Sequence, residues 1–98
     1  MYHLDHLLTM LTTDKAKALQ FRVGSPPLMV SEDEEHPLQG PPISAEEVME
    51  LLRCMASSRQ IRDLRYRGAI SFISTPRGRA PFVVRARVQG DTIEFDVS

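Results

Sequence analysis

The sequence predicts an α+β domain in which helices pack on one face of an antiparallel sheet. Leucines recur at helical spacing near the N-terminus, two serine capping patterns precede apolar residues in the middle, and apolar and polar residues alternate in the last third. The chain has 98 residues, of which 42% are hydrophobic. This size and composition predict a single domain, residues 1–98, with one core.

The first half of the chain predicts a helix and then a strand that a turn interrupts. The helix carries one apolar stripe, formed by Leu4, Leu7, Leu8 and Leu11. From residue 17 to residue 23 the apolar period becomes two, which is typical of a strand with one buried face. Gly24 can take a positive φ, and Pro26 and Pro27 cannot donate hydrogen bonds to a sheet, so the chain must turn there. A short strand at residues 28–30 follows, and we expect it to form an exposed sheet edge.

The middle of the chain predicts a solvated loop and then two helices. Residues 31–42, SEDEEHPLQGPP, contain four consecutive acids, three prolines and a glycine, which favours a loop. Ser44 with Glu47, and Ser57 with Gln60, have the spacing of N-terminal capping boxes. Core-facing residues follow each cap, and these are Val48, Leu51, Leu52, Met55, Ile61 and Leu64.

The last third of the chain predicts three antiparallel strands. A two-residue turn at residues 90–91 would bring inward residues opposite inward residues, including Ile93, Phe95 and Val97. The same register places Arg87 opposite Glu94 on the outer face. It also places Arg85 opposite Asp96, and each such cross-strand pair stabilises a sheet by about 0.2–1 kcal/mol.

Composition restricts the class of protein. The longest apolar run is far below the ~20 residues that a membrane-spanning helix needs, and the N-terminus lacks the basic and then apolar pattern of a signal peptide. We therefore expect a cytoplasmic protein without membrane insertion. Cys54 is the only cysteine, so the chain can form no internal disulfide. Its apolar neighbours predict a buried structural thiol, and a reactive thiol is the alternative.

Charge is distributed unevenly along the chain. Residues 1–50 hold nine acids and three bases, whereas residues 51–98 hold nine arginines and four acids. This asymmetry raises the question of nucleic-acid binding. The strand arginines have acidic neighbours, however, the aromatic residues mostly occupy core positions, and no standard nucleic-acid module is recognisable. We expect no nucleic-acid partner.

Motifs for catalysis, cofactors and metals are not found in the sequence. His3 and His6 have helical spacing, but a metal site needs three or four ligands, which favours surface histidines. The Pro-Arg-Gly-Arg stretch at residues 76–79 could meet a phosphate, and a hairpin tip explains it better. No phosphate-binding loop or nucleophile with a partner base is recognisable. The sequence therefore predicts no catalytic, cofactor-binding or metal site.

Element order and one distinctive turn resemble the N-terminal domain of the PilT twitching-motility and secretion ATPase family. In that family a first helix leads into a strand that ends in a Gly-x-Pro-Pro turn, matched here by residues 24–27. Pro42-Ile43-Ser44 resembles the family's entry into its next helix, and Ile70-Ser71-Phe72 resembles its penultimate hairpin. The resemblance spans nearly the whole chain and implies a sheet of PAS-like appearance.

The sequence also departs from the family's pattern. Lys17-Ala18-Leu19-Gln20 stands where the family has a Ser-Asp-Leu-His-like signature, and residues 30–33 replace its Val-Asp-Gly turn. Arginines common in its later strand fall at Pro81 and Val83. Contacts of those family residues are therefore not transferred to this chain.

The family's nucleotide-binding domain would lie beyond Ser98, so we expect a domain that is not an enzyme. In the family this domain packs on a neighbouring subunit, which implies an interaction or regulatory module. A sensor of a small, nucleotide-type ligand is the alternative. Met1 and the final strand favour a complete domain rather than a fragment of a longer ATPase.

Core packing does not account for the exposed edge at residues 28–30, which could pair with another chain, or for two charged surfaces, which form the candidate interface. The basic one consists of Arg59, Arg62, Arg65, Arg67, Arg77 and Arg79. The acidic one consists of Glu32, Asp33, Glu34 and Glu35. A head-to-tail contact between the two would suit another copy of the chain or a pilus or secretion ATPase subunit. Neutralisation of one surface by the other within the same chain is the alternative.

Overall fold

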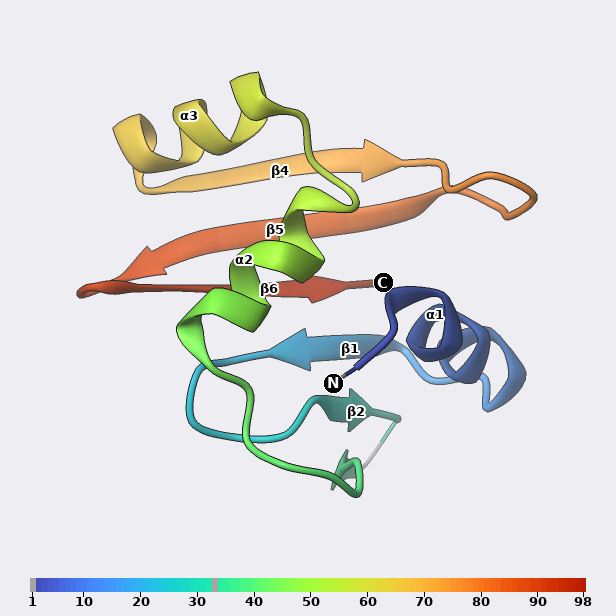
Figure 1. Ribbon diagram of the computed structural model, residues 1–98. Coiled ribbons are helices and arrows are strands. Elements are labelled where there is room, and N and C mark those ends of the chain that lie inside the picture. The colour runs from blue at the N-terminus through green and yellow to red at the C-terminus, as the bar shows by residue number, and fades with distance from the viewer. Residues whose placement is uncertain (1, 33) are drawn as a thin grey trace.

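The structure is a computed structural model, and it describes residues 2–32 and 34–98. It contains a six-stranded sheet in the order β3-β2-β1-β6-β5-β4 (Figure 1). All neighbouring strands are antiparallel. The strands are β1 (Ala18–Phe21), β2 (Leu28–Val30), β3 (Glu35–Pro37), β4 (Ala69–Ser74), β5 (Phe82–Gln89) and β6 (Thr92–Val97).

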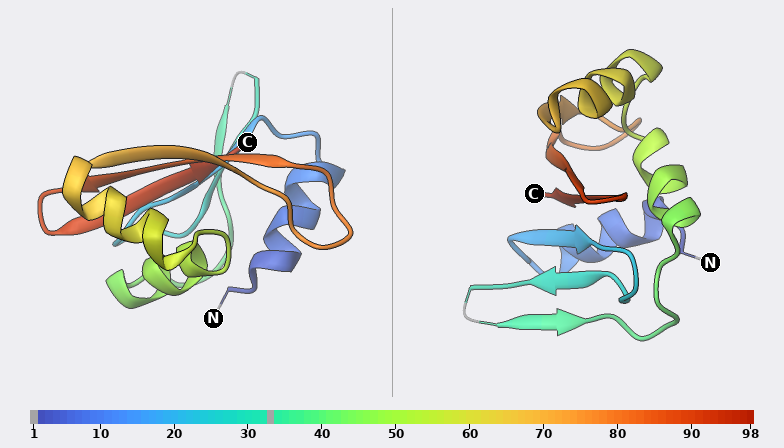
Figure 2. Two further views of the ribbon diagram at one scale, coloured as in Figure 1. Left: turned by 90° about the horizontal axis from the view of Figure 1, so that it is seen from above. Right: turned by 90° about the vertical axis from the view of Figure 1, so that its left-hand side faces the viewer.

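Three helices complete the fold: α1 (Leu4–Thr13), α2 (Ala45–Arg53) and α3 (Ser58–Arg67). They lie on one side of the sheet and leave its other side open (Figure 2). The α+β class and the one-sided arrangement expected from the sequence are therefore confirmed.

The core lies between the helices and the covered face of the sheet. The two central strands contribute Leu19 and Phe21 from β1 and Phe95 and Val97 from β6, all of them buried. The rings of Phe21 and Phe95 stack with their centroids 4.5 Å apart. The helices add their apolar stripes, namely Leu7, Leu8, Leu11, Val48, Leu51, Leu52, Ile61 and Leu64. Most of the predicted inward positions are thus buried, but Leu4 and Met55 are only partly buried, and Val23 and Val88 are exposed.

The Gly-Ser-Pro-Pro turn closes against the start of α2. Gly24 has a φ of 91°, in the region that favours glycine. Its N–H donates to the carbonyl oxygen of Ile43 at 2.9 Å, and the N–H of Ile43 donates to the carbonyl oxygen of Ser25 at 3.0 Å. Pro27 is fully buried. The turn therefore fixes the start of α2 to the end of β1.

Both predicted helix starts are present. Ser57 accepts the N–H of Gln60, and the side chain of Gln60 accepts the N–H of Ser57, so this capping box is complete. Ser44 accepts the N–H of Glu47 at 3.1 Å, which is one half of the second box. Gly68 ends α3 in the left-handed region with a φ of 87°.

The predicted register of the last hairpin is confirmed, with one difference in its charge pairing. Arg87 lies opposite Glu94, and Arg85 lies opposite Asp96. Arg87, however, contacts both acids: its Nε is 2.6 Å from Glu94 Oε1 and its Nη1 is 3.3 Å from Asp96 Oδ2. The diagonal contact is possible because an arginine side chain spans the distance to the next cross-strand neighbour.

The sequence interpretation was wrong at one edge of the sheet. Residues 35–37, inside the expected loop, form β3 and pair with β2. The expected edge strand, residues 28–30, is therefore an interior strand. All three residues of β3 are exposed, so no apolar alternation marks this strand in the sequence.

Cys54 is exposed, and the expectation of a buried thiol was wrong. The helix α2 ends at Arg53, so Cys54 lies just beyond the apolar stripe, and Ala56 occupies the next buried position. The Cys54 thiol donates to the carbonyl oxygen of Glu50 at 3.3 Å. In the described residues, no helix has the length and apolar character needed to cross a membrane.

Candidate interaction surface

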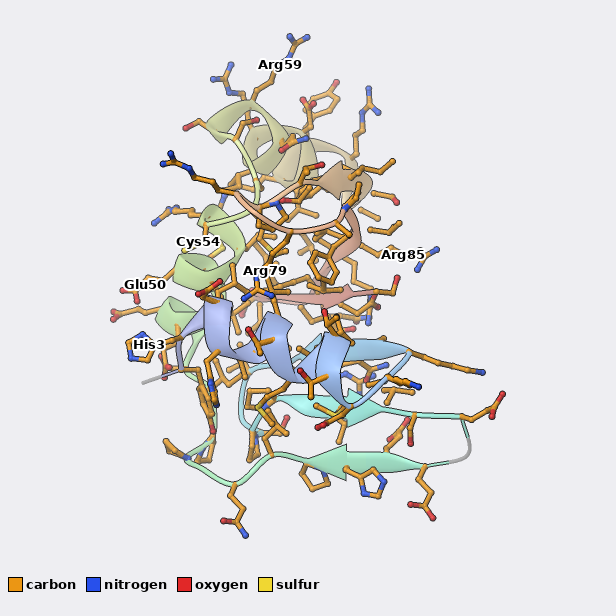
Figure 3. The ribbon with its side chains drawn as sticks, turned by 90° about the vertical axis from the view of Figure 1, so that its right-hand side faces the viewer. His3, Glu50, Cys54, Arg59, Arg79 and Arg85 are labelled. Carbon is orange, nitrogen blue, oxygen red and sulfur yellow. The ribbon has the colours of Figure 1, made fainter. Side chains whose placement is uncertain are left out.

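Four of the six predicted basic residues lie together on α3. Ile61 and Leu64 point into the core, which turns the arginines of the helix toward solvent. Asp63 is the one acid within α3. No ion pair recorded for the described residues involves these arginines, and Figure 3 shows Arg59 projecting from the outer end of the molecule. We call this set the α3 basic surface, and it comprises Arg59, Arg62, Arg65 and Arg67.

Tyr66 adds an aromatic side chain to this surface, and the sequence analysis missed it. Its side chain is 91% exposed, the largest exposed fraction among the exposed large hydrophobic residues. The signal was present in the sequence, because Tyr66 lies two residues after Leu64 and so falls off the apolar stripe. Tyrosine and arginine are the residue types that dominate binding energy at protein interfaces.

The other two predicted arginines lie elsewhere. Arg77 and Arg79 are in the β4–β5 loop, at the opposite end of β4 from the α3–β4 connection (Figure 1). Arg79 binds α1 instead of facing a partner: its Nη2 is 2.8 Å from Asp5 Oδ1, 3.0 Å from the Asp5 carbonyl oxygen and 2.6 Å from Thr9 Oγ1. The six arginines therefore do not form one continuous surface, and Arg79 ties a loop to a helix.

The acidic residues lie at the far edge of the sheet from α3. Glu34 and Glu35 lie at the start of β3, whereas α3 packs near β4. Glu34 Oε2 is 2.9 Å from His36 Nε2, and Glu32 Oε1 is 3.9 Å from Lys17 Nζ. The fourth predicted acid, Asp33, lies outside the described residues. In the described part of the chain, the acidic residues and the α3 basic surface thus do not neutralise each other.

The open face of the sheet carries a compact charge network. Arg87 contacts Glu94 and Asp96, and Arg22 Nε is 3.6 Å from Glu94 Oε2. Burial opposes the charge of Arg87, but its hydrogen bonds to the two acids prevail and raise the pKa of its guanidinium above the ordinary value. Arg85 is exposed and projects away from the helices (Figure 3). The charges of this network are paired with one another, whereas Arg85 remains available to bind a partner.

A small hollow lies between the N-terminal residues and α2. It measures about 190 Å³ and is lined by Tyr2, His3, Leu4, Glu47, Glu50, Leu51 and Cys54. Partial burial, and then the nearby Glu47 carboxylate, raise the pKa of Tyr2 above its ordinary value. Among the described residues, no three His, Cys, Asp or Glu side chains form a group that could hold a metal ion.

Comparison by sequence finds no match among protein-family models, and none among curated proteins. Comparison by structure finds clear matches. The pilus retraction motor PilT with bound ADP matches with a TM-score of 0.85 and 17% identity over 99% of this chain. The ATPase DotB of Legionella pneumophila matches with a TM-score of 0.74 and 16% identity over 96% of this chain. DotB of Yersinia pseudotuberculosis gives a TM-score of 0.71 and 16% identity over 99%.

This chain covers only part of each of these ATPases: 28% of PilT, 28% of the Legionella DotB and 30% of the Yersinia DotB. At such low identity the matches concern the fold, and they agree with the resemblance that the Gly-Ser-Pro-Pro turn and the element order indicated. The chain therefore has the fold of the N-terminal domain of the PilT and secretion ATPase family.

Proposed function

We propose that this chain is a non-catalytic protein-interaction module of a pilus or secretion machinery, and that its α3 basic surface binds an acidic surface of a partner protein. One observation carries the proposal: four arginines and Tyr66 lie exposed on one short helix, and no ion pair recorded in the described residues engages those arginines. Exposed arginines near an aromatic side chain are typical of binding surfaces.

Two kinds of partner fit this surface. The structural neighbours are a pilus retraction motor and two ATPases, which supports a subunit of such a motor as the partner. The acidic residues at the β3 edge supply a matching surface on a second copy of this chain. In both cases the module would act through contact and regulation, and where the partner is a motor subunit, catalysis would belong to that subunit.

A binding titration with a purified pilus or secretion ATPase from the same organism tests the proposal. We expect wild-type binding to weaken as salt rises, because exposed charges are screened. The Arg62→Glu/Arg65→Glu variant should bind at least about tenfold more weakly. Lys15→Glu/Arg77→Glu is the matched control, since it makes the same charge change at exposed sites in the α1–β1 connection and the β4–β5 loop. If the two variants bind equally well, or if neither they nor the wild type binds, the proposal is overturned.

A small-ligand sensor remains the second candidate, and a hollow beside Arg65 could receive a ligand. It measures about 330 Å³ and lies between Arg65, the start of α2 and the β5–β6 turn at residues 90–91. The space between the helices and the sheet is occupied by core side chains such as Phe21, Phe95 and Leu52. A thermal-shift screen against nucleotides and cyclic dinucleotides distinguishes the two candidates. A saturable shift that Arg65→Ala abolishes would favour the sensor.

A further inference from the structure

The two edges of the sheet differ in how well they resist pairing with another strand. Natural proteins protect edge strands by making them short or by placing charges and prolines on them. The β3 edge has three residues and includes Glu35 and Pro37. The β4 edge has six residues, Ala-Ile-Ser-Phe-Ile-Ser, with neither a charge nor a proline. The β4 edge therefore lacks these three protections, and α3 packs beside it on the helix side.

Hydrogen bonding identifies the backbone groups of β4 that point outward. The N–H of Val88 donates to the carbonyl oxygen of Gly68 at 2.8 Å, so residue 68 faces β5. Because this orientation alternates along an antiparallel strand, residues 70, 72 and 74 also bond to β5. The N–H and C=O groups of Ala69, Ser71 and Ile73 then point away from the sheet. The side chains of these three residues are exposed.

The surroundings of β4 leave room for another strand. On the helix side, a groove of about 370 Å³ runs between α3 and β4 and is lined by Gln60, Asp63, Arg67 and residues 69–72. On the other side, a hollow of about 420 Å³ is lined by residues 69–71 and 85–87. Ile73, near the end of the strand, is 69% exposed and offers an apolar contact. An added strand could therefore place alternate side chains on both sides of the sheet.

The charge around β4 indicates an acidic occupant. Arg67 lines the groove on the helix side, together with a single acid, Asp63. Arg85 lies opposite Ser71 on the open face, and no recorded ion pair of the described residues includes it. Arginine thus flanks the edge on both faces, so acidic side chains of an added strand would meet complementary charge on either side.

A second copy of this chain does not supply that strand. At the β3 edge, the N–H of Leu38 donates to the carbonyl oxygen of Pro27 at 2.9 Å, so the alternation turns residue 37 outward. Residue 37 is a proline and has no N–H to donate there. Pairing of β4 with β4 of another copy by a two-fold axis would place two α3 basic surfaces side by side, and their like charges would repel.

We propose that an extended, acidic segment of a different protein adds to β4 as a further antiparallel or parallel strand, with part of its side chains in the groove beside α3. This inference rests on the proposed function, because it uses the same side of the molecule, and it adds how the partner is held. Main-chain hydrogen bonds to Ala69, Ser71 and Ile73 would provide affinity, while the flanking arginines would select acidic sequences.

Amide hydrogen exchange of the full chain, with a synthetic peptide as the probe, tests this directly. The probe is acetyl-Glu-Val-Glu-Val-Glu-Val-Glu-amide, and its controls are the Lys-for-Glu peptide and the same acidic peptide with every amide N-methylated. We expect the acidic probe alone to slow exchange at the amides of Ala69, Ser71 and Ile73. The amides of residues 70, 72 and 74 are already bonded to β5 and should change little. Absence of probe binding overturns the proposal.

A pair of variants at one position separates backbone pairing from side-chain contact. Ser71→Pro removes an outward N–H that β5 does not use, and we expect it to reduce probe binding at least about tenfold. Ser71→Ala keeps that N–H and should bind as the wild type does. Should Ser71→Pro fail to fold, the N-methylated peptide still decides, because binding by that peptide contradicts strand addition.

The outcomes also distinguish this inference from the proposed function. One result would support the proposed function alone: the ATPase binds and Arg62→Glu/Arg65→Glu weakens that binding, but neither the probe nor the ATPase protects the amides of Ala69, Ser71 and Ile73. Strand addition would then be wrong, and the α3 basic surface would stand as the interaction surface. If neither the ATPase nor the probe binds, both proposals are overturned.

Discussion

Tyr66 is the side chain of α3 that the core does not use. It lies between Arg65 and Arg67 and is 91% exposed, so its ring contributes nothing to the packing that holds α3 on the sheet. Exposure of a large aromatic side chain to water is unfavourable, and a partner that covers it recovers that free energy. Tyr66 should therefore matter for binding and little for folding.

The Tyr66→Ala variant tests this assignment. We expect the binding free energy for the ATPase partner to fall by about 1–2 kcal/mol, because tyrosine is among the residue types that dominate interfaces. The free energy of unfolding should change by less than about 0.5 kcal/mol, as for other exposed positions. Binding titration and urea unfolding of the same preparations measure the two quantities. Unchanged affinity would remove Tyr66 from the interface.

Arg79, in contrast to Tyr66, should matter for folding and little for binding. It joins the β4–β5 loop to α1 through Asp5 and Thr9, and its own side chain is only 20% exposed, whereas that of Asp5 is 88% exposed. Solvent around Asp5 weakens the ion pair, so most of the effect comes from the additional hydrogen bonds.

We expect Arg79→Ala to lower the free energy of unfolding by about 0.5–1.5 kcal/mol. Arg77→Ala is the matched control, because Arg77 is exposed in the same loop and should leave stability unchanged within about 0.5 kcal/mol. Thermal or urea unfolding measures both. Equal effects from the two variants would show that the contact between Arg79 and α1 does not stabilise the fold.

At the scale of elements, the outer face of the β5–β6 hairpin carries one arginine that forms ion pairs with its neighbours and one that forms none. Arg87 lies between Glu94 and Asp96, whose side chains are only 16% and 17% exposed. Arg85, two residues earlier on the same strand and face, is exposed. The hairpin thus contains its own comparison between a paired and an unpaired arginine.

Replacement of Arg87 by alanine should lower the free energy of unfolding by about 1–3 kcal/mol, because two neighbouring acids would then lie partly buried without their cation. Arg85→Ala should change it by less than about 0.5 kcal/mol. Urea unfolding at neutral pH checks the difference. A larger effect at Arg85 would mean that the cross-strand partner, and not the diagonal contact, stabilises Asp96.

Sequence periodicity predicted those elements that bury one face and missed the one that buries none. The strands β1, β5 and β6 and all three helices have apolar stripes, and the Gly90-Asp91 turn fixed the hairpin register. The strand β3 is exposed throughout, and only its pairing with β2 defines it. Its acidic residue and its proline favoured a loop, so the sequence pattern did not predict a strand there. Cys54 was misplaced because its burial depends on where α2 ends.

The candidate surface was likewise predictable where it depends on helical spacing, and unpredictable where it depends on contacts between distant residues. Helical spacing placed the arginines of α3 on the solvent side, since Ile61 and Leu64 define the buried side. The contact of Arg79 with Asp5 joins residues 74 positions apart, and no local pattern reveals such a contact. The groove beside β4 likewise depends on how α3 and β4 pack, which follows from the tertiary fold.

At the scale of the whole molecule, opposite charges lie at opposite edges of one sheet. The α3 basic surface lies at the β4 end, and Glu32, Glu34 and Glu35 lie at the β2–β3 end. Such a molecule can attract another copy head to tail, because the basic end of one faces the acidic end of the next. The contact would be ionic and weak, since these charges are exposed and screened by salt.

A charge exchange between two variants tests the head-to-tail contact. Arg62→Glu/Arg65→Glu makes the α3 end acidic, and Glu32→Lys/Glu34→Lys/Glu35→Lys makes the β2–β3 end basic, so each variant alone should repel its own copies. We expect wild-type protein to associate weakly at low salt, each variant alone to sediment as a monomer, and their equimolar mixture to associate again, because every contact between the two variants joins opposite charges. Sedimentation velocity across a salt series measures this. A mixture that stays monomeric, like the separate variants, would exclude a second copy as the partner of α3 and leave the ATPase subunit as the acidic surface that it meets.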